Sequence, residues 1–459
     1  LLKEAPLVPP GEAIQWRDKP MAEKAALPFA AATKLVMSLV FSWSIASHLA
    51  WSGPTEGTLS AAGLPSRVLR GEELQDLMPL EPLWDIVLPL FSLTIGTSLG
   101  ALGMQLTLGL TFVQPLLLLL LPSFLSILEN FHERLLAWHL GGIFGQPMLV
   151  AQVAIAHAER HQGTGCLKAF GVLVGVYTVG AVVGGLIRRG LQMLHAHQAC
   201  ARMLILLLVT GNLMTIWYQG HLLGHEEAFP DSSKAESRPL LDRKRLRLLK
   251  ERMSRFLFHE VERALLSLTS CSRHLAARAA VLLGLTSIMG PAPLPALDLI
   301  SFSLHPSHFA VFCFDLVGSA SYSIIVPMLE SLGDSSRRLQ GLDLFFYASW
   351  AFLLLAVMAA LSHLTCTLQV SMLAGLVLSS CCAVVSAVLS ADMSEKAPHL
   401  ADVGVRLAWG LFCGAIAQFV GAQLGQVLFL WSSWFGVCGF ALCCLLLSRH
   451  WTHQALEDP

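Results

Sequence analysis

The sequence contains few charged residues: they make up 13% of its 459 residues, against about 25% in a typical soluble globular protein. Hydrophobic residues account for 54% of the chain. Many of them fall in apolar segments of about 20 residues, the length that crosses a hydrocarbon core of roughly 30 Å. This pattern excludes a soluble globular fold and predicts an all-α, multi-pass membrane protein.

Several other features are absent. No Asn-x-Ser/Thr triplet occurs, so N-glycosylation is not expected. The loop 51–82 has no cysteine, and most of the eleven cysteines lie inside apolar segments, which argues against a disulfide-stapled external domain. The sequence has no Walker loop and no Cys-x-x-Cys pair. We therefore assign no catalytic residue, no metal site and no cofactor, and the net charge of −1 gives no reason to expect a nucleic-acid partner.

The apolar segments predict about twelve transmembrane helices in two sets of six. The segment 274–291 is the least certain, because "GPAPLP" interrupts it early. The first set is 28–50, 83–105, 107–128, 133–157, 165–188 and 199–220, and the second is 274–291, 306–330, 342–364, 366–392, 403–427 and 428–449.

This division predicts five regions. They are a cytosolic N-terminal segment (1–27), a six-helix bundle (28–220), a basic cytosolic linker with an amphipathic helix (221–273), a second six-helix bundle (274–449) and a cytosolic tail (450–459). The orientation follows from lysine and arginine, which are enriched in cytosolic loops. They gather before the first span, in the middle loop at 243–255 and after the eighth span.

An internal repeat links the two sets of helices. The fifth predicted helix reads "VGAVVGG" at 179–185 and the eleventh reads "VGAQLGQ" at 420–426. Glycine inside a helix costs roughly 1 kcal/mol relative to alanine, but in a membrane a small-residue face lets another helix come close. We expect the glycines of the fifth helix, Gly175, Gly180, Gly184 and Gly185, to allow close approach at an interface that moves; plain packing is the alternative.

Three patterns resemble the major facilitator superfamily of secondary transporters. The first is the glycine series of the fifth helix, where Ala181 replaces the proline of the family motif. The second is "RLLAWHLGGIFGQP" at 134–147, and the third is the charged turn "GDSSRRLQG" at 333–341. The family's charged turn between the second and third helices is missing, because this sequence reads "GALGMQLTLG" there. The candidate conformational-motif residues are Arg134, Gly180, Gly184, Gly185, Asp334, Arg337 and Arg338.

The resemblance implies two pseudo-symmetric bundles and a central cavity lined by the first, fourth, seventh and tenth helices. Asp315 lies inside the eighth span, where an ionisable group is costly; it is a candidate for proton coupling or, alternatively, a structural carboxylate. Candidate substrate-binding residues on the cavity helices are Lys34, Ser42, His48, His139, Gln146, Gln152, Thr286, Gln369 and Ser379.

The middle loop carries "ESRPLL" at 236–241. Its spacing of Glu236, Leu240 and Leu241 matches the acidic dileucine signal for sorting to endosomes and lysosomes, although such short matches also arise by chance. We therefore expect either an endosomal or lysosomal membrane or the plasma membrane.

Together these patterns predict a secondary transporter, not an enzyme, that moves a small polar or amphipathic solute by alternating access. Two alternatives stay open. One is a transporter-like subunit or chaperone of a membrane complex that no longer transports, and the other is a multi-pass membrane transferase. The expected partners are the solute, the lipid bilayer and a possible accessory membrane subunit.

Overall fold

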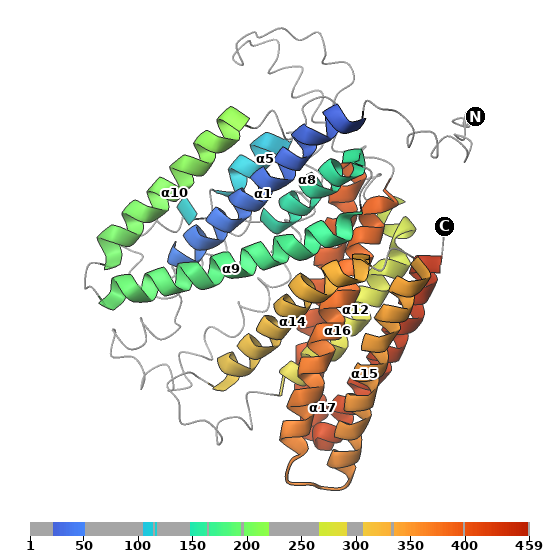
Figure 1. The fold of residues 1–459 in the computed structure, drawn as a ribbon. Coiled ribbons are helices and arrows are strands. Elements are labelled where there is room, and N and C mark those ends of the chain that lie inside the picture. Colours follow the sequence, from blue (N-terminus) through green and yellow to red (C-terminus); the bar gives the residue numbers. More distant parts are fainter. Residues whose placement is uncertain are drawn as a thin grey trace.

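The computed structural model describes residues 22–50, 104–112, 115–116, 147–162, 165–193, 197–219, 266–291, 306–331, 335–397 and 400–457 (Figure 1). These residues are helical, with short turns, and no strand occurs among them. The helices are α1 (Ala22–Ala50), α5 (Met104–Thr111), α8 (Pro147–Gln162), α9 (Cys166–Met193), α10 (His197–Gln219), α12 (Ser272–Met289), α14 (Pro306–Ser331), α15 (Ser335–Leu361), α16 (Thr367–Glu395) and α17 (Leu400–Glu457).

The apolar composition of these segments explains why they are helical. Inside a bilayer each backbone N–H and C=O must be hydrogen-bonded within the protein, and a continuous apolar helix achieves this by itself. Five of the described helices contain a segment long and apolar enough to cross a membrane. The predicted all-α membrane protein is therefore confirmed. Those segments are Cys166–Arg188, Cys200–Gln219, Arg338–Leu361, Thr367–Glu395 and Asp402–Glu457.

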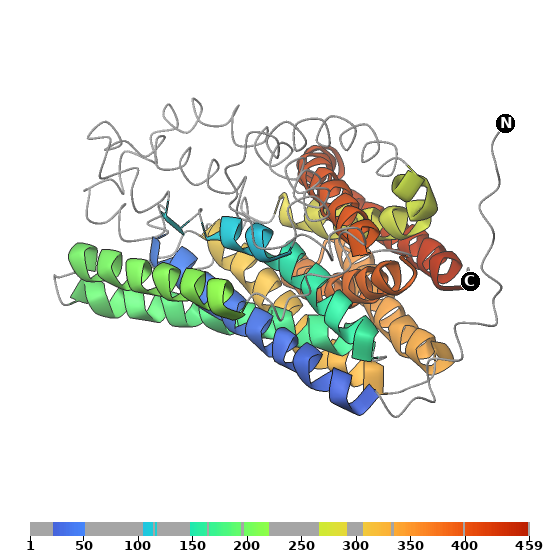
Figure 2. The ribbon, with the colours of Figure 1, turned by 90° about the horizontal axis from the view of Figure 1, so that it is seen from above.

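The described helices form two groups, which we call the first half (α1 to α10) and the second half (α12 to α17). In the first half, α1 lies against α8, α9 and α10, and in the second half α12 lies along α17 (Figures 1 and 2). The two halves meet mainly where α9 packs against α14, with further contacts from α8 and α9 to α16. The domain boundaries remain predictions.

The structure corrects two predicted boundaries in the first half. Residues 104–111 form helix α5, which extends from the expected third span (107–128) back over part of the expected uncharged turn. Leu108 and Phe112 are buried, and the Trp43 indole donates a hydrogen bond to the Thr111 carbonyl at 2.9 Å. A segment without charge gains more from this burial than from contact with water. Similarly, α8, which is described from Pro147, continues beyond the predicted end at residue 157 through part of the expected polar turn to Gln162.

In the second half, the uncertain segment 274–291 forms α12 and is largely buried. The expected spans 403–427 and 428–449 form one helical run, α17, which is interrupted at Ser432 and Ser433. The break therefore lies several residues beyond the predicted boundary. Its cause is local: Ser433 adopts a positive φ of 54°, and the Ser432 hydroxyl donates to the Leu428 carbonyl at 2.9 Å.

Candidate functional site

The glycines of the first repeat segment lie against the backbone of α1. A Cβ atom added at Gly180 would lie 2.8 Å from the Phe41 carbonyl oxygen, and one at Gly184 would lie 2.9 Å from the Ile45 carbonyl oxygen. Neither distance leaves room for a side chain. Gly185, by contrast, has no neighbour within 4 Å of the same position. Two of the three motif glycines thus make a close helix contact, and this contact lies within the first half.

The glycines of the second repeat segment make the same contact in the second half. A Cβ added at Gly421 would lie 2.6 Å from the Leu283 carbonyl oxygen of α12, and one at Gly425 would overlap the Ser287 backbone. The contacted residues of α1 and those of α12 differ by one constant number of sequence positions, which we call the displacement. It pairs Phe41 with Leu283, Ser44 with Thr286 and Ile45 with Ser287.

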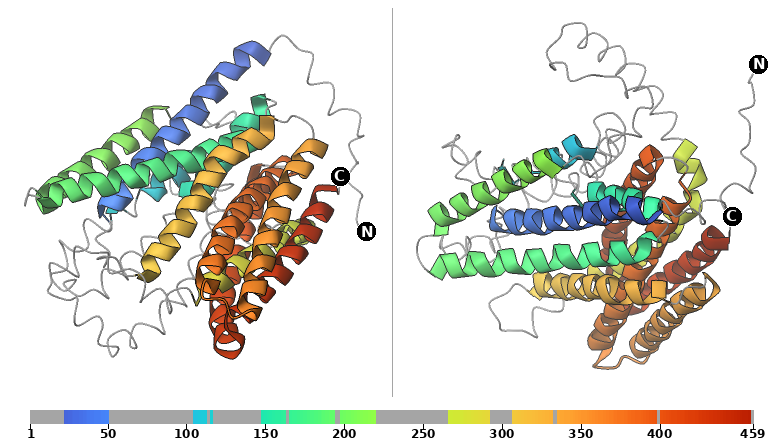
Figure 3. Two further views of the ribbon diagram at one scale, coloured as in Figure 1. Left: turned by 60° about the horizontal axis from the view of Figure 1, so that its bottom comes forward. Right: turned by 45° about the horizontal axis from the view of Figure 1, so that its top comes forward.

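Two other glycines of α9 meet the second half. A Cβ added at Gly171 would lie 2.7 Å from the Pro327 ring of α14, and one at Gly175 would lie 3.1 Å from the Ser323 hydroxyl. The ends of α9 and α14 lie side by side in Figure 3. The interface between the halves therefore uses Gly171 and Gly175, one to two turns before the motif glycines.

The N-terminus of α9 is capped by carboxylates from the other half. The Cys166 N–H donates to Glu395 Oε1 of α16 at 3.2 Å, and the Lys168 N–H donates to Glu330 at the end of α14. The first N–H groups of a helix have no partner within the helix and carry a partial positive charge. Gly165 precedes the helix, and a Cβ there would lie 2.7 Å from the Glu330 carboxylate. The absence of a side chain at Gly165 therefore lets the carboxylates reach these amides.

A reciprocal contact runs from the first half to the end of α16. Arg160, near the end of α8, donates from Nη2 to the carbonyls of Ser394 at 2.8 Å and Ala397 at 2.6 Å. The last carbonyls of a helix lack partners and attract cations. We call the contacts made by Arg160, Glu330 and Glu395 the cross-half contact. Each half supplies a charge that neutralises a helix end of the other, so the contact holds this end of the molecule closed.

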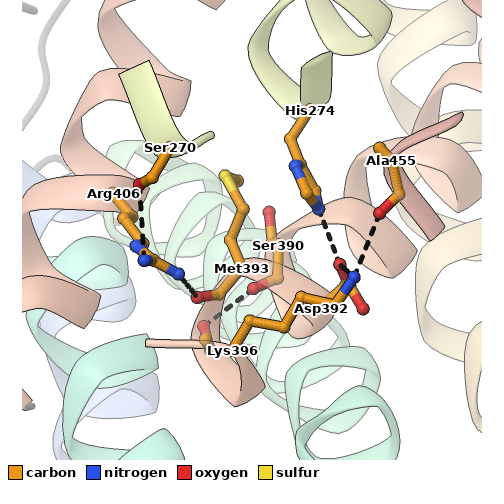
Figure 4. A network of polar contacts seen from close by, with 9 residues as sticks. Ser270, His274, Ser390, Asp392, Met393, Lys396, Arg406 and Ala455 are labelled. Carbon is orange, nitrogen blue, oxygen red and sulfur yellow. Dashed lines mark hydrogen bonds and ion pairs between the residues drawn. The ribbon is translucent and has the colours of Figure 1, made fainter. Parts of the chain in front are cut away.

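A polar network fixes the same end of α16 within its own half (Figure 4). Asp392 accepts from His274 of α12 at 2.6 Å and pairs with Lys396 at 3.2 Å. Lys396 also donates to the Ala455 carbonyl of α17 at 3.1 Å, and Arg406 donates to the Met393 carbonyl at 3.4 Å. The groups that Arg160 contacts are thereby held against α12 and α17.

The substrate-binding candidates on α1 have different surroundings. Lys34 is exposed. Ser42 accepts a hydrogen bond from Asn212 Nδ2 of α10 at 2.5 Å, so its hydroxyl is engaged inside the first half. His48 is partly buried, and its Nδ1 lies 2.8 Å from the Ser44 carbonyl.

The other described candidates contact different helices. Gln152 is partly buried on α8, and Gln369 is exposed near the start of α16. Thr286 donates to the Leu282 carbonyl at 2.8 Å and lies against α17. Ser379 is buried against α14, where its hydroxyl would lie 2.9 Å from a Cβ at Gly318. A substrate-binding role for any of them stays a prediction.

Several predicted residues cannot be placed. Asp315 and Arg337 belong to α14 and α15, but their side chains lie outside the described part of the structure. Arg338 is partly buried and interacts electrostatically with Glu330, so it borders the cross-half contact. The candidates outside the described residues are His139, Gln146, Arg134, Asp334, Glu236, Leu240 and Leu241.

Sequence reasoning missed the three residues of the cross-half contact. Arg160 and Glu395 lie in the polar turns "AHAERHQGTG" and "ADMSEKAPH" of the two halves, and Glu330 lies at the end of a span. A charge at the end of an apolar segment normally indicates only the membrane surface. The available signal was that the two corresponding turns each carry charged residues of both signs, so that a charge in one could meet a complementary group in the other.

Comparisons with known proteins identify the fold. No model of a known protein family and no curated protein sequence matches the chain. Among solved structures, the human organic anion transporter MFSD10 is 16% identical with a TM-score of 0.55, over 92% of this chain and 99% of that one. A bacterial homologue of the iron transporter ferroportin in an outward-facing state and the E. coli fucose:proton symporter FucP are each 12% identical with a TM-score of 0.56, over 93% of this chain and 99% of theirs. The predicted major-facilitator-like fold is therefore confirmed.

Proposed function

We propose that this chain, which has the fold of major facilitator superfamily transporters, is a secondary transporter that moves a small polar or amphipathic solute by alternating access. The observation that carries the proposal is the cross-half contact. It joins the two halves at one end through groups that water could also solvate, so the halves can part without leaving a buried charge unpaired.

The energetics suit a reversible latch. A hydrogen bond to a charged group contributes about 1.5–3 kcal/mol, and the cross-half contact contains four of them, from Arg160 and to Glu330 and Glu395. Because opening would replace these bonds by bonds to water, the net difference between the closed and open states is a small part of their sum. A difference of a few kcal/mol is what a solute's binding energy can reverse.

We further propose that the closed end is cytosolic. It adjoins Arg338, in the basic turn after the eighth predicted span, and lysine and arginine are enriched on the cytosolic side. In this orientation both termini and the middle loop are cytosolic, and the conformation is outward-facing. The bacterial ferroportin homologue and FucP, which have the same fold, have each been solved in an outward state.

A native thiol reports on this proposal. Cys166 is 3% exposed and its backbone is part of the cross-half contact. We expect Arg160→Gln to increase the rate of Cys166 alkylation by a maleimide several-fold in native membranes, measured by mass spectrometry, because the weakened contact opens more often. Cys444, which is buried and lies after the break in α17, should react with the maleimide at an unchanged rate.

A change in the electrostatic surroundings of Cys166 cannot by itself explain faster alkylation in Arg160→Gln. Removing a carboxylate beside a thiol makes it easier to ionise, so Glu330→Gln combined with Glu395→Gln would raise reactivity even without opening. Loss of the Arg160 cation has the opposite electrostatic effect. Glu457→Gln, on an exposed carboxylate, is the matched control. Unchanged Cys166 labelling in Arg160→Gln would contradict the latch.

Proton coupling through Asp315 is the finer part of the proposal. It predicts that solute added to liposomes containing the protein acidifies the lumen, as read by an enclosed pH-sensitive dye, and that Asp315→Asn abolishes this signal. Uptake that persists without proton movement would remove the coupling role and leave transport intact. A co-purifying membrane partner, together with no flux of any solute, would favour the subunit alternative.

The membrane in which the protein acts is a separate proposal. If the acidic dileucine signal operates, replacing Leu240 and Leu241 by alanine moves a tagged protein from endosomes or lysosomes to the plasma membrane. An unchanged distribution would show that these residues do not sort the protein.

A further inference from the structure

Arg278 is a cation in the interior of the second half. It lies on α12, and its Nη1 is 3.4 Å from the Ser390 hydroxyl of α16. Its Nε atom is buried without a hydrogen-bond partner among the described residues. A guanidinium has five N–H donors, so most of this donor capacity is unused within the described structure.

The groups around Arg278 do not balance its charge. The described side chains that interact with it electrostatically are Tyr322 of α14, Cys382 of α16 and Cys413 of α17, and phenols and thiols are neutral at pH 7. An arginine inside a membrane protein is costly unless it is paired or serves a function.

Four described carboxylates of the second half are engaged with other groups. Asp392 is held by His274 and Lys396, and Asp343 pairs with Arg449 and His453. Glu330 and Glu395 cap α9. Within the described part of the chain, Arg278 therefore has no carboxylate partner.

The internal repeat shows that the fold does not require this arginine. The displacement that pairs Phe41 with Leu283 also pairs Val36 with Arg278. Val36 is buried in the core of the first half at 1% exposure. An apolar residue thus fills the equivalent position, and the arginine is specific to the second half.

Helix α17 carries glycines where it faces the guanidinium of Arg278. A Cβ added at Gly410 of α17 would lie 3.0 Å from Arg278 Nη1, and one at Gly414 would lie 3.7 Å from Nε. The difference in residue number that pairs Gly180 with Gly421 also pairs Ala169 with Gly410 and Leu173 with Gly414. Ala169 and Leu173 are both buried in the first half. Larger residues in one half and glycines in the other leave room for the guanidinium.

We infer that Arg278 is the anion-binding group of the solute site, and that the solute is a small organic anion with a carboxylate. The inference rests on the proposed transport function and adds the class of solute. Arginine donates to a carboxylate through two parallel bonds, and Ser390 and Tyr322 add hydroxyl groups beside it. Ser390 lies one turn before Ser394 on α16, so the site and the cross-half contact share one helix.

The test uses benzoate, neutral benzamide and cationic benzylamine as matched probes, with chloride as the inorganic anion. We expect benzoate to raise the melting temperature of the purified full chain in a concentration-dependent manner, whereas the other three do not. Arg278→Gln should weaken the apparent benzoate affinity at least tenfold, and Arg278→Lys should weaken it less. Arg202→Gln, an exposed arginine on α10, is the control and should bind benzoate normally.

The outcomes separate this inference from the transport proposal. Benzoate binding that depends on Arg278, without uptake of radiolabelled benzoate into liposomes, supports the site and contradicts transport. Uptake of benzamide or benzylamine that is independent of Arg278 supports transport and overturns the inference. The inference is also overturned if Arg278→Gln is unstable and Asp315→Asn in the same chain restores stability, because Arg278 would then be an internal ion-pair partner. If Arg278→Gln does not fold, equal shifts by benzoate and benzamide in the native chain overturn it.

Discussion

The two halves share a backbone framework but differ in the polar groups placed on it. In each half a Gly-x-x-x-Gly segment lies against the backbone of that half's first described helix, α1 or α12. The halves differ in the polar contacts made near the start of α1 and of α12. His274 lies 2.6 Å from Asp392, which also pairs with Lys396, whereas near the same end of α1 Thr33 donates a 3.4 Å hydrogen bond to Glu159 of α8.

This difference shows which contacts the fold needs and which it does not. Close helix approach is found twice, so it belongs to the framework. The network around Asp392 occurs in the second half only, among the described residues, and ties the end of α16 to α12 and α17. The first half therefore meets a fixed surface when Arg160 contacts α16.

The largest predicted effect comes from filling the glycine contacts. We expect Gly184→Leu and Gly425→Leu each to reduce the yield of folded, monodisperse protein severely, because the added atoms meet backbone that cannot rotate away. Overpacking typically costs 1–3 kcal/mol and sometimes more. Size-exclusion profiles and melting temperatures measure the loss, and Gly185→Leu is the control, because its added Cβ has no neighbour within 4 Å. If only one half were sensitive, the framework would not be shared.

An intermediate effect on stability is expected from removing the polar contacts of Asp392 on α16 and of Thr33 on α1. Asp392→Asn should lower the free energy of unfolding by about 1–3 kcal/mol, because it weakens the bonds to His274 and Lys396 and leaves their donors less well paired. Thr33→Ala removes one long hydrogen bond and should cost well under 1 kcal/mol. Thermal unfolding in one detergent compares the two. Equal losses would contradict the contrast between the halves.

The smallest effects are expected at the outermost helices. Asn212 of α10 bonds to Ser42 without a formal charge, whereas Arg449 of α17 pairs with Asp343 of α15 near the surface. We expect Asn212→Ala to cost about 1 kcal/mol at any ionic strength, and Arg449→Gln to cost less than about 1 kcal/mol, declining with added salt. A salt-independent loss in Arg449→Gln would show that packing dominates there.

The sequence predicts the helices well because apolar length alone determines what can cross a bilayer. It also identifies the repeat at 179–185 and 420–426, since small residues in apolar helices have few other uses. It does not identify the partners of these glycines, because helix neighbours depend on packing between distant segments. Of the glycines expected at the moving interface, Gly180 and Gly184 lie against α1, whereas Gly175 lies against the other half together with Gly171.

The candidate site was harder to predict. Arg160, Glu330 and Glu395 lie at helix ends, where charges usually indicate only the membrane surface, and their pairing depends on three-dimensional proximity. Arg278 carried a stronger signal, because "LAARAAVLL" places a cation inside an apolar segment, yet the uncertain boundaries of 274–291 obscured its depth. The substrate-binding candidates relied on the cavity helices alone, and hydroxyl groups on such helices often bond to their own backbone, as Thr286 does.

The break in α17 sets how the protein sits in the lipid. Ser432 and Ser433 alone reverse the chain between two apolar helices, and the neighbouring Leu430 and Trp431 are 77% and 86% exposed. Tryptophan favours the level of the lipid headgroups. The turn is thus an anchor at the membrane surface, with almost no chain beyond it for a protease, an antibody or an inserted epitope to reach.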